Sequence, residues 1–317
     1  MTAATGALLT DRGVLRVAGA EAGHFLHNLV TCDIDRLAVG AAAYGALLTP
    51  QGKIVADFVI LRAADDAFVL DVPKAALGEL AKRLTLYQLR AAVTVSDRSD
   101  EMAVVALWGA EAAAVPADTA ARRPHGSDAA GPADAGGGAV FPDPRLAQLG
   151  WRAVLPRRRA AALVNGLPGA EADYHRHRIG LGVPEGGRDF GFGDAFPHDA
   201  DLDQLSGVDF GKGCYVGQEI VSRMQHRGTA RRRIVKARGA AALPASGTAL
   251  VAGGRAVGEL GSTDGRDGLA LVRIDRVGEA RGEATPVTAD GVAVELTIPA
   301  WARFAWPVTP ASETSAR

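Results

Sequence analysis

Residues 211–219 read Gly-Lys-Gly-Cys-Tyr-Val-Gly-Gln-Glu, and this stretch holds one of the two cysteines of the chain. Three glycines surround Cys214, Lys212 precedes it by two residues, and a segment with helical periodicity follows over 216–225. Helix N-termini and neighbouring cations both favour a thiolate over a thiol. The stretch is not a Walker A loop, because Lys212 precedes glycine instead of serine or threonine. It therefore predicts a reactive cysteine, and the alternative is a small buried side chain.

A run of basic residues follows this stretch. The run consists of Arg223, Arg227, Arg231, Arg232, Arg233, Lys236 and Arg238. The preceding residues 194–209 contain five aspartates and no lysine or arginine, so part of the run is expected to pair with them. The remainder is either a solvated face or an anion site for phosphates or a polycarboxylate tail. The lack of interleaved aromatic residues disfavours binding of single-stranded nucleic acid.

No resident metal site is predicted. Residues 199–203 alternate aspartates as a calcium loop does, but Gln204 and Phe210 stand where an EF-hand needs glycine and glutamate. Two cysteines cannot supply the four thiolates of an iron–sulfur cluster within one chain. The close histidine pairs lack a cysteine or acid at a familiar metal spacing; they are His24 with His27, and His175 with His177.

Composition narrows the class of protein. The 317 residues are enough for two or three domains, and 35 basic against 36 acidic residues give a net charge of −1. This balance argues against bulk nucleic-acid binding and against attachment to an acidic membrane surface. The first 16 residues do not resemble a secretory signal, and no window approaches ~18 uninterrupted apolar residues. With only two cysteines, a reducing compartment is expected, and we predict a cytoplasmic protein.

Hydrophobic spacing predicts an α+β fold for the first part of the chain, because strands, hairpins and helices are mixed. A hairpin turn is predicted at 50–53. Strands are predicted over 14–17, 44–49, 54–61, 67–72, 93–95, 102–107, 139–141 and 151–155, and helices over 20–30, 73–87, 158–165 and 170–181.

From residue 231 onward the pattern changes to short apolar strands separated by Gly and Asp turns, which predicts a small antiparallel barrel or sandwich. These strands are expected near 233–237, 248–252, 256–260, 269–273 and 292–298. The predicted domains are 1–228, with a mobile Ala-, Pro- and Gly-rich loop over 116–138, and 229–305, followed by a loose tail over 306–317.

Asp57 interrupts the otherwise apolar strand predicted over 54–61. Strand alternation places its carboxylate on the same face as Val55 and Val59. A carboxylate at this position either faces solvent or lines a cavity, and the sequence leaves both possibilities open.

The chain resembles a known family in several of these segments. Residues 212–219, continuing as Ile-Val-Ser-Arg-Met-Gln-His-Arg-Gly, are similar to the signature of the YgfZ-type folate-binding proteins, which are relatives of the T-protein (aminomethyltransferase) of the glycine cleavage system. The resemblance extends over about residues 8 to 300. It includes the helix and Thr-x-Asp turn at 25–33, the hairpin at 47–53, the approach to the signature at 205–214, and the strand at 269–273.

The resemblance implies an N-terminal folate-binding region of intertwined α+β subdomains and a C-terminal antiparallel β-barrel, arranged around a central cavity. It implies a tetrahydrofolate-dependent role in iron–sulfur protein assembly or repair, with effects on tRNA-modifying iron–sulfur enzymes. The implied partners are folate and iron–sulfur client or assembly proteins, with no stable nucleic-acid binding and no membrane.

The family's functional positions are carried over one by one. Asp57 follows the hairpin Gly52 by five residues, as the catalytic aspartate of the T-protein does, and Cys214 matches the functional cysteine, with Lys212 beside it. Tyr174 stands where a YgfZ protein places a folate-contacting tryptophan. Gly180 stands where the T-protein holds the pterin with a glutamate. The predicted folate contacts are Asp33, Lys53, Tyr174, Tyr215, Gln218, Glu219, Arg223 and Arg227.

Three functions are therefore compared. The favoured one is a tetrahydrofolate-binding factor for iron–sulfur protein assembly or repair, in which Cys214 acts as a nucleophile, redox thiol or transient ligand. The alternative is a folate-dependent aminomethyltransferase that uses Asp57 as its catalytic carboxylate. The third is an RNA-contacting accessory protein that uses the arginine run.

Overall fold

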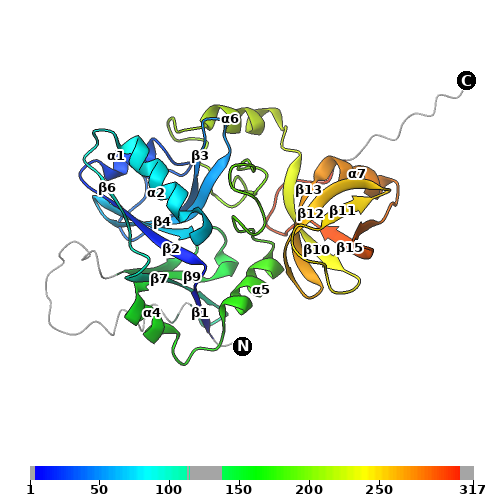
Figure 1. Cartoon of the computed structure of the whole chain (residues 1–317), viewed down its shortest axis with the longest axis horizontal. Coiled ribbons are helices and arrows are strands. Elements are labelled where there is room, and N and C mark those ends of the chain that lie inside the picture. Colours follow the sequence, from blue (N-terminus) through cyan, green and yellow to red (C-terminus); the bar gives the residue numbers. More distant parts are fainter. Residues whose placement is uncertain (1–3, 113, 115–137, 308–317) are drawn as a thin grey trace, which may run out of the picture.

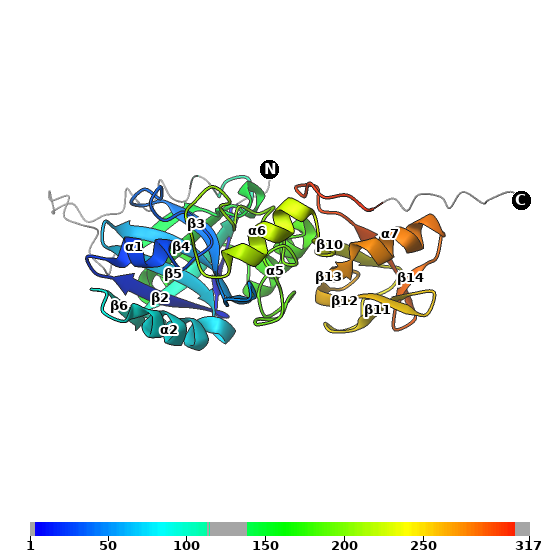
Figure 2. The same ribbon diagram turned by 90° about the horizontal axis from the view of Figure 1, so that it is seen from above.

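The computed structural model describes residues 4–112, 114 and 138–307. Nearly all of the loop predicted over 116–138 and most of the tail predicted over 306–317 lie outside these residues. The described chain forms an N-terminal region built on two antiparallel sheets, followed by a barrel (Figures 1 and 2).

A five-stranded sheet forms one half of the N-terminal region. Its strand order is β3-β4-β5-β2-β6, with β2 (Arg12–Ala18), β3 (Ala42–Leu48), β4 (Ile54–Ala64), β5 (Ala67–Pro73) and β6 (Thr94–Asp97). One face of the sheet packs against α1 (Ala22–His27) and α2 (Lys74–Gln88). In this layer Leu80 and Leu84 of α2 share a core with Phe58 of β4, as the leucine stripe of the helix predicts.

A four-stranded sheet forms the other half. It is ordered β1-β7-β9-β8, with β1 (Thr5–Leu9), β7 (Met102–Trp108), β9 (Trp151–Pro156) and β8 (Ala139–Pro142). The 3-10 turn η1 (Ala147–Leu149) lies between β8 and β9, and α4 (Arg157–Val164) covers the outer face. The inner faces of the two sheets share one core, in which Val104 and Ala106 meet Tyr44 and Val59.

Two further helices and an irregular segment connect these sheets to the barrel. Helix α5 (Glu171–Leu181) packs Ile179 against the outside of the barrel, on Ile234, Leu269 and Leu271. An irregular segment, 182–217, leads to α6 (Gln218–Arg227), which runs along the upper edge of the N-terminal region in Figure 1. No helix among the described residues is long and apolar enough to cross a membrane.

The C-terminal unit is a closed antiparallel barrel of order β10-β13-β12-β11-β14-β15. Its strands are β10 (Arg232–Gly239), β11 (Ala249–Ala252), β12 (Arg255–Asp264), β13 (Asp267–Arg273), β14 (Val287–Ala289) and β15 (Val292–Thr297), and α7 (Ile274–Gly282) follows β13. The predicted fold class, an α+β region followed by an antiparallel β-barrel, is confirmed.

Four elements of the described residues were not predicted: β1, η1, β14 and α7. Helix α7 contains two glycines and has weak helical propensity, and it is held by the packing of Ile274, Val277 and Ala280 on the barrel core.

The prediction that Val55 shares a face of its strand with Asp57 is wrong. A bulge shifts the pairing between Leu47 and Leu48, so Val55 joins the helix-covered core while Val59 faces the core between the sheets.

Candidate functional site

The signature loop, residues 211–217, presents Cys214 to solvent. Helix α6 begins at Gln218, so Cys214 precedes the helix by four residues. The predicted position of the thiol at the N-terminus of the helix is therefore wrong. The carboxylate of Asp209 accepts hydrogen bonds from the backbone N–H of Gly211 (2.7 Å) and Lys212 (3.0 Å). These bonds fix the entry to the loop and leave the thiol exposed.

Lys212 anchors the signature loop to the end of α1. Its Nζ donates hydrogen bonds to the carbonyl oxygens of His27 (2.6 Å), Val30 (2.6 Å) and Cys32 (2.9 Å). An ammonium has three protons, so this geometry commits all of them to carbonyls. Lys212 therefore positions the loop, and an effect of its charge on the Cys214 thiol stays a prediction.

The second cysteine has a different environment. Cys32 is buried, and this burial raises its pKa to about 12, although the nearby charge of Lys212 opposes the shift. It lies against Gly45, where an added Cβ would come within 2.6 Å of its Sγ. Cys32 is thus a packed thiol, and Cys214 is the accessible one.

The glycines of the signature and of the hairpin allow these two segments to touch. Gly217 has φ +81°, and a Cβ there would lie 2.5 Å from the carbonyl oxygen of Thr49. A Cβ on Gly52 would lie 3.0 Å from Ile220 of α6. Lys53 of the same hairpin donates to the carbonyl oxygen of Asp194 and lies 3.5 Å above the ring of Phe196.

Asp33 stabilises the turn that follows α1. Its Oδ1 accepts hydrogen bonds from the backbone N–H of Asp35 (3.0 Å) and Arg36 (3.1 Å), and it lies 3.6 Å from Nδ1 of His27. The structure thus gives the carboxylate of Asp33 a local role in the turn.

Asp57 lies on β4 between the two sheets and is 2% exposed. Its Oδ2 accepts a hydrogen bond from the hydroxyl of Tyr44 (2.9 Å), while its Oδ1 has no hydrogen-bond partner among the residues that the structure describes. A Cβ on Gly186 would lie 2.2 Å from that Oδ1 and 2.6 Å from the ring of Phe192. Burial raises the pKa of this carboxyl, partly opposed by the charge of Arg12.

An ion network fills the space around Asp57. We use this name for Arg12, Asp71, Asp143, Arg145, Arg152, Tyr174, Arg178, Glu185 and Asp189. Arg152 pairs with Asp71 and with Asp143 (2.9 Å), Arg12 pairs with Asp71 (2.5 Å) and Glu185 (3.0 Å), and Arg178 pairs with Asp189 (2.6 Å). Although burial opposes the charged form, Arg145 and Arg152 hold the pKa of Asp143 below its usual range.

Tyr174 belongs to this network. It is 1% exposed, and its hydroxyl accepts hydrogen bonds from Arg145 (2.9 Å) and Arg152 (2.6 Å). Its ring lies 5.8 Å from that of Trp108. The structure therefore brings Tyr174 and Asp57 into one buried region.

The residues of this region do not fit a pterin in this structure. Gly186 and Phe192 cover the bare oxygen of Asp57, and two arginines and Trp108 enclose Tyr174. The other predicted folate contacts lie apart from them. Glu219, Arg223 and Arg227 are exposed on α6, and Gln218 is half-buried at its start. Tyr215 is buried, and its hydroxyl has no hydrogen-bond partner in the described part of the chain.

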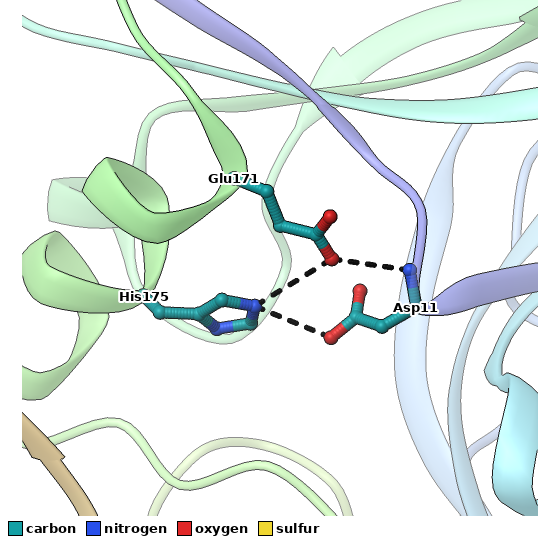
Figure 3. Close-up of side chains that lie close together, drawn as sticks. All are labelled: Asp11, Glu171 and His175. Carbon is teal, nitrogen blue, oxygen red and sulfur yellow. Dashed lines mark hydrogen bonds and ion pairs between the residues drawn. The ribbon is translucent and has the colours of Figure 1, made fainter.

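Three possible metal ligands converge at a separate place, where Asp11 meets α5 (Figure 3). Nε2 of His175 lies 3.2 Å from Oδ2 of Asp11 and 3.8 Å from Oε1 of Glu171. However, Arg178 donates to Nδ1 of His175 (3.0 Å), so Nε2 carries the proton of the neutral ring. Arg188 also donates to Asp11 (2.8 Å). Asp11 is thus paired with Arg188, and in this tautomer Nε2 of His175 offers no lone pair to a cation.

The basic run divides into paired and unpaired parts. Arg232 pairs with Asp194 (3.1 Å), and Arg233 pairs with Asp203 (2.6 Å), which confirms that part of the run neutralises the preceding aspartates. Arg223 forms an exposed pair with Glu219 (2.5 Å). The side chains of Arg227 and Arg231 are exposed and have no partner among the described residues.

The fold and the signature define a class, the T-protein-like proteins that carry a C-terminal barrel. Residues 9–127 match the GCVT N-terminal domain, and residues 231–304 match the CAF17 C-terminal beta-barrel domain. The glycine cleavage system aminomethyltransferase T from Bartonella henselae superposes with a TM-score of 0.73 at 20% identity, covering 94% of this chain and 86% of that chain. This likeness shows a shared fold.

Sequence relatives then define the family within that class. The mitochondrial iron–sulfur cluster assembly factor IBA57 of Homo sapiens is 33% identical over 94% of this chain and 84% of its own length. The Mus musculus protein of the same name is 32% identical over the same shares. The chain belongs to the IBA57 family of iron–sulfur cluster assembly factors.

Two predictions need correction. The resemblance was correct for T-protein relatives that act on iron–sulfur proteins, but the matched relatives are IBA57 proteins, not the YgfZ branch. The prediction of a cytoplasmic protein is wrong, because the named relatives are mitochondrial. Cysteine content and charge distinguish reducing from oxidising compartments, and they do not separate one reducing compartment from another.

Proposed function

We propose that this protein supports iron–sulfur cluster assembly through the thiol of Cys214. The observation that carries the proposal is the contrast between the two cysteines: Cys214 is exposed, whereas Cys32 is buried with a raised pKa. A thiolate is the ligand that iron–sulfur clusters prefer. Because one cysteine supplies only one of the four ligands that a cluster needs, a partner protein or a small thiol must supply the others.

The surroundings of Cys214 suit this role. Lys212 and Asp209 hold the loop through five hydrogen bonds to backbone groups, so the thiol projects from a fixed support. Preorganised ligands lose less conformational entropy when they bind. The proposed clients are iron–sulfur proteins, including the tRNA-modifying enzymes that the family resemblance implies.

Tetrahydrofolate takes no part in this proposal. The space beside Asp57 and Tyr174 is occupied by protein groups, so no step is assigned to a bound folate. The same closure opposes the aminomethyltransferase alternative, because a catalytic carboxylate must reach its substrate within hydrogen-bond distance.

The test is rescue of a strain that lacks this protein, read out as the activity of an iron–sulfur enzyme such as aconitase. We expect the wild-type chain and Cys32→Ala to restore the activity at equal protein levels, and Cys214→Ala to fail. Full rescue by Cys214→Ala would contradict the role of the thiol. Loss of rescue by a folded Asp57→Asn would favour the transferase alternative instead.

A further inference from the structure

His27, the last residue of α1, lies against the signature loop. Nζ of Lys212 donates to the carbonyl oxygen of His27 (2.6 Å), although the two residues are 185 positions apart in the chain. A Cβ added to Gly213 would lie 4.0 Å from Nε2 of His27, and that nitrogen is the nearest atom outside the chain neighbours of Gly213. The imidazole therefore lies beside the residue that precedes the exposed Cys214.

The other ring nitrogen of His27 faces two carboxylates. Nδ1 lies 3.6 Å from Oδ1 of Asp33 and 3.5 Å from Oδ2 of Asp35, and the side chain of His27 is 14% exposed. Nδ1 is buried, and no described residue donates a hydrogen bond to it. Two carboxylates and no donor favour the tautomer in which Nδ1 carries the proton. Nε2 then keeps its lone pair, on the side of the signature loop.

These surroundings are those of a metal-binding imidazole. Such a ring usually directs its other N–H at a carboxylate, which fixes the tautomer and the orientation of the ring. The carboxylate of Asp33 is itself held in place, because it accepts hydrogen bonds from the backbone N–H of Asp35 (3.0 Å) and Arg36 (3.1 Å). His175 differs, since Arg178 donates to its Nδ1 (3.0 Å) and so leaves the proton on Nε2.

We propose that Cys214 and His27 form a site for one ferrous ion, with the thiolate and Nε2 as its two protein ligands. This inference rests on the proposed function, because cluster assembly is what supplies the iron. Thiolate and imidazole both suit iron in proteins. Bonds of about 2.1–2.3 Å place the two donor atoms about 3.5 Å apart in a tetrahedral site, and rotation of the exposed Cys214 side chain is the movement that this requires. Binding releases the thiol proton to solvent, and water or small ligands complete the coordination.

The test is anaerobic titration of the purified chain with Co²⁺ alone, read out by the thiolate-to-cobalt charge-transfer band and the visible bands of a tetrahedral site. We expect wild type to bind one equivalent and Cys214→Ala to lose the charge-transfer band. His27→Ala should weaken Co²⁺ binding by about tenfold or more, a loss that even removal of an outer partner of a metal ligand causes. The matched control is His24→Ala, which removes the exposed histidine one turn earlier in α1 and should leave binding unchanged.

Two further variants distinguish a ligand from a support of the loop. In His27→Cys a thiolate replaces the imidazole, so we expect binding to return with a stronger charge-transfer band. In Asp33→Asn the amide oxygen still accepts the hydrogen bonds of the turn, but the charge that orients the ring is lost, and binding should weaken by about tenfold. A histidine that only supported the loop would not be replaced by cysteine. Urea unfolding of each variant checks that it is folded.

The outcomes separate this inference from the proposed function. Equal Co²⁺ affinity of wild type and folded His27→Ala would overturn the iron site, while failure of Cys214→Ala to restore aconitase activity would leave the thiol role in place. Absence of Co²⁺ binding by the wild type, or binding that Cys214→Ala does not change, would overturn the site as well. Full rescue by Cys214→Ala would contradict the proposed function, whereas Co²⁺ binding that depends on both residues would still support the site.

Discussion

Lys212 and Asp57 are both buried and ionisable, but their surroundings differ. Lys212 donates to three carbonyl oxygens, so each of its protons has a partner. Asp57 accepts one hydrogen bond from Tyr44 and keeps a bare Oδ1 against Gly186. A buried carboxylate without full compensation favours its neutral form.

This contrast predicts the pH dependence of Asp57→Asn. Since the folded pKa of Asp57 is raised by burial above 3.8, the folded chain binds this proton more tightly than the unfolded chain does. The stability of the wild type relative to Asp57→Asn should therefore fall as pH rises from about 4 through the raised folded pKa. At neutral pH we expect the asparagine variant to be more stable by about 1 kcal/mol or more.

Urea unfolding of both proteins across that pH range measures the difference. Each protein gives a curve of the free energy of unfolding against pH. The difference between the two curves removes the effect of Asp143, which both proteins share and whose lowered pKa makes stability rise with pH. Parallel curves for the two proteins would show that Asp57 has no raised pKa in the folded state.

At the scale of elements, the contact between the β3–β4 hairpin and α6 depends on glycine. Gly217 is the residue before the helix and has φ +81°, and its neighbour across the contact is the carbonyl oxygen of Thr49. Gly217→Ala should cost about 2–4 kcal/mol, because it combines backbone strain with a steric clash.

Gly180 provides the matched control for this substitution. It lies within α5, and an added Cβ there meets nothing within 4 Å. Gly180→Ala should therefore stabilise the protein by about 0.5–1 kcal/mol through helix propensity. Chemical denaturation of the two variants gives the comparison, and equal midpoints would refute the packing argument.

The same elements show what periodicity can and cannot predict. The leucine stripe of α2 predicted its bounds to within a residue, because one face of that helix is wholly apolar. The start of α6 was placed two residues early, since Tyr215 and Val216 continue an apolar pattern that the left-handed Gly217 interrupts. Strand alternation likewise predicts the wrong face for Val55, because a bulge reverses the alternation there and has no signal in the sequence.

At the scale of the whole molecule, the ion network joins the two sheets. Arg12 and Asp71 are 59 residues apart, and Asp71 and Arg152 are 81 residues apart, yet they form one connected group. The resemblance indicated Asp57 and Tyr174, but no spacing rule relates the four arginines of the network to them. This is why the resemblance implied a folate cavity where the structure places buried ion pairs.

Arg152 is the residue whose loss should affect this arrangement most. It extends from β9 in one sheet to Asp71 on β5 in the other, and it also binds Asp143 and the hydroxyl of Tyr174. Arg152→Met keeps most of the side-chain volume but leaves two buried carboxylates with one cation fewer. Removing one partner of a buried ion pair costs about 3–5 kcal/mol, and we expect a loss of that size.

The control is Arg176→Met, which removes an arginine that is 60% exposed and bound to Asp173 and Asp264. Exposed pairs contribute about 0–1 kcal/mol, so this variant should unfold at nearly the wild-type urea concentration. Because Arg152 ties one sheet to the other, its variant should lower the unfolding midpoint of the N-terminal region as a single cooperative step. An unchanged midpoint would mean that apolar packing alone holds the sheets together and that the network could be opened for a ligand at little cost.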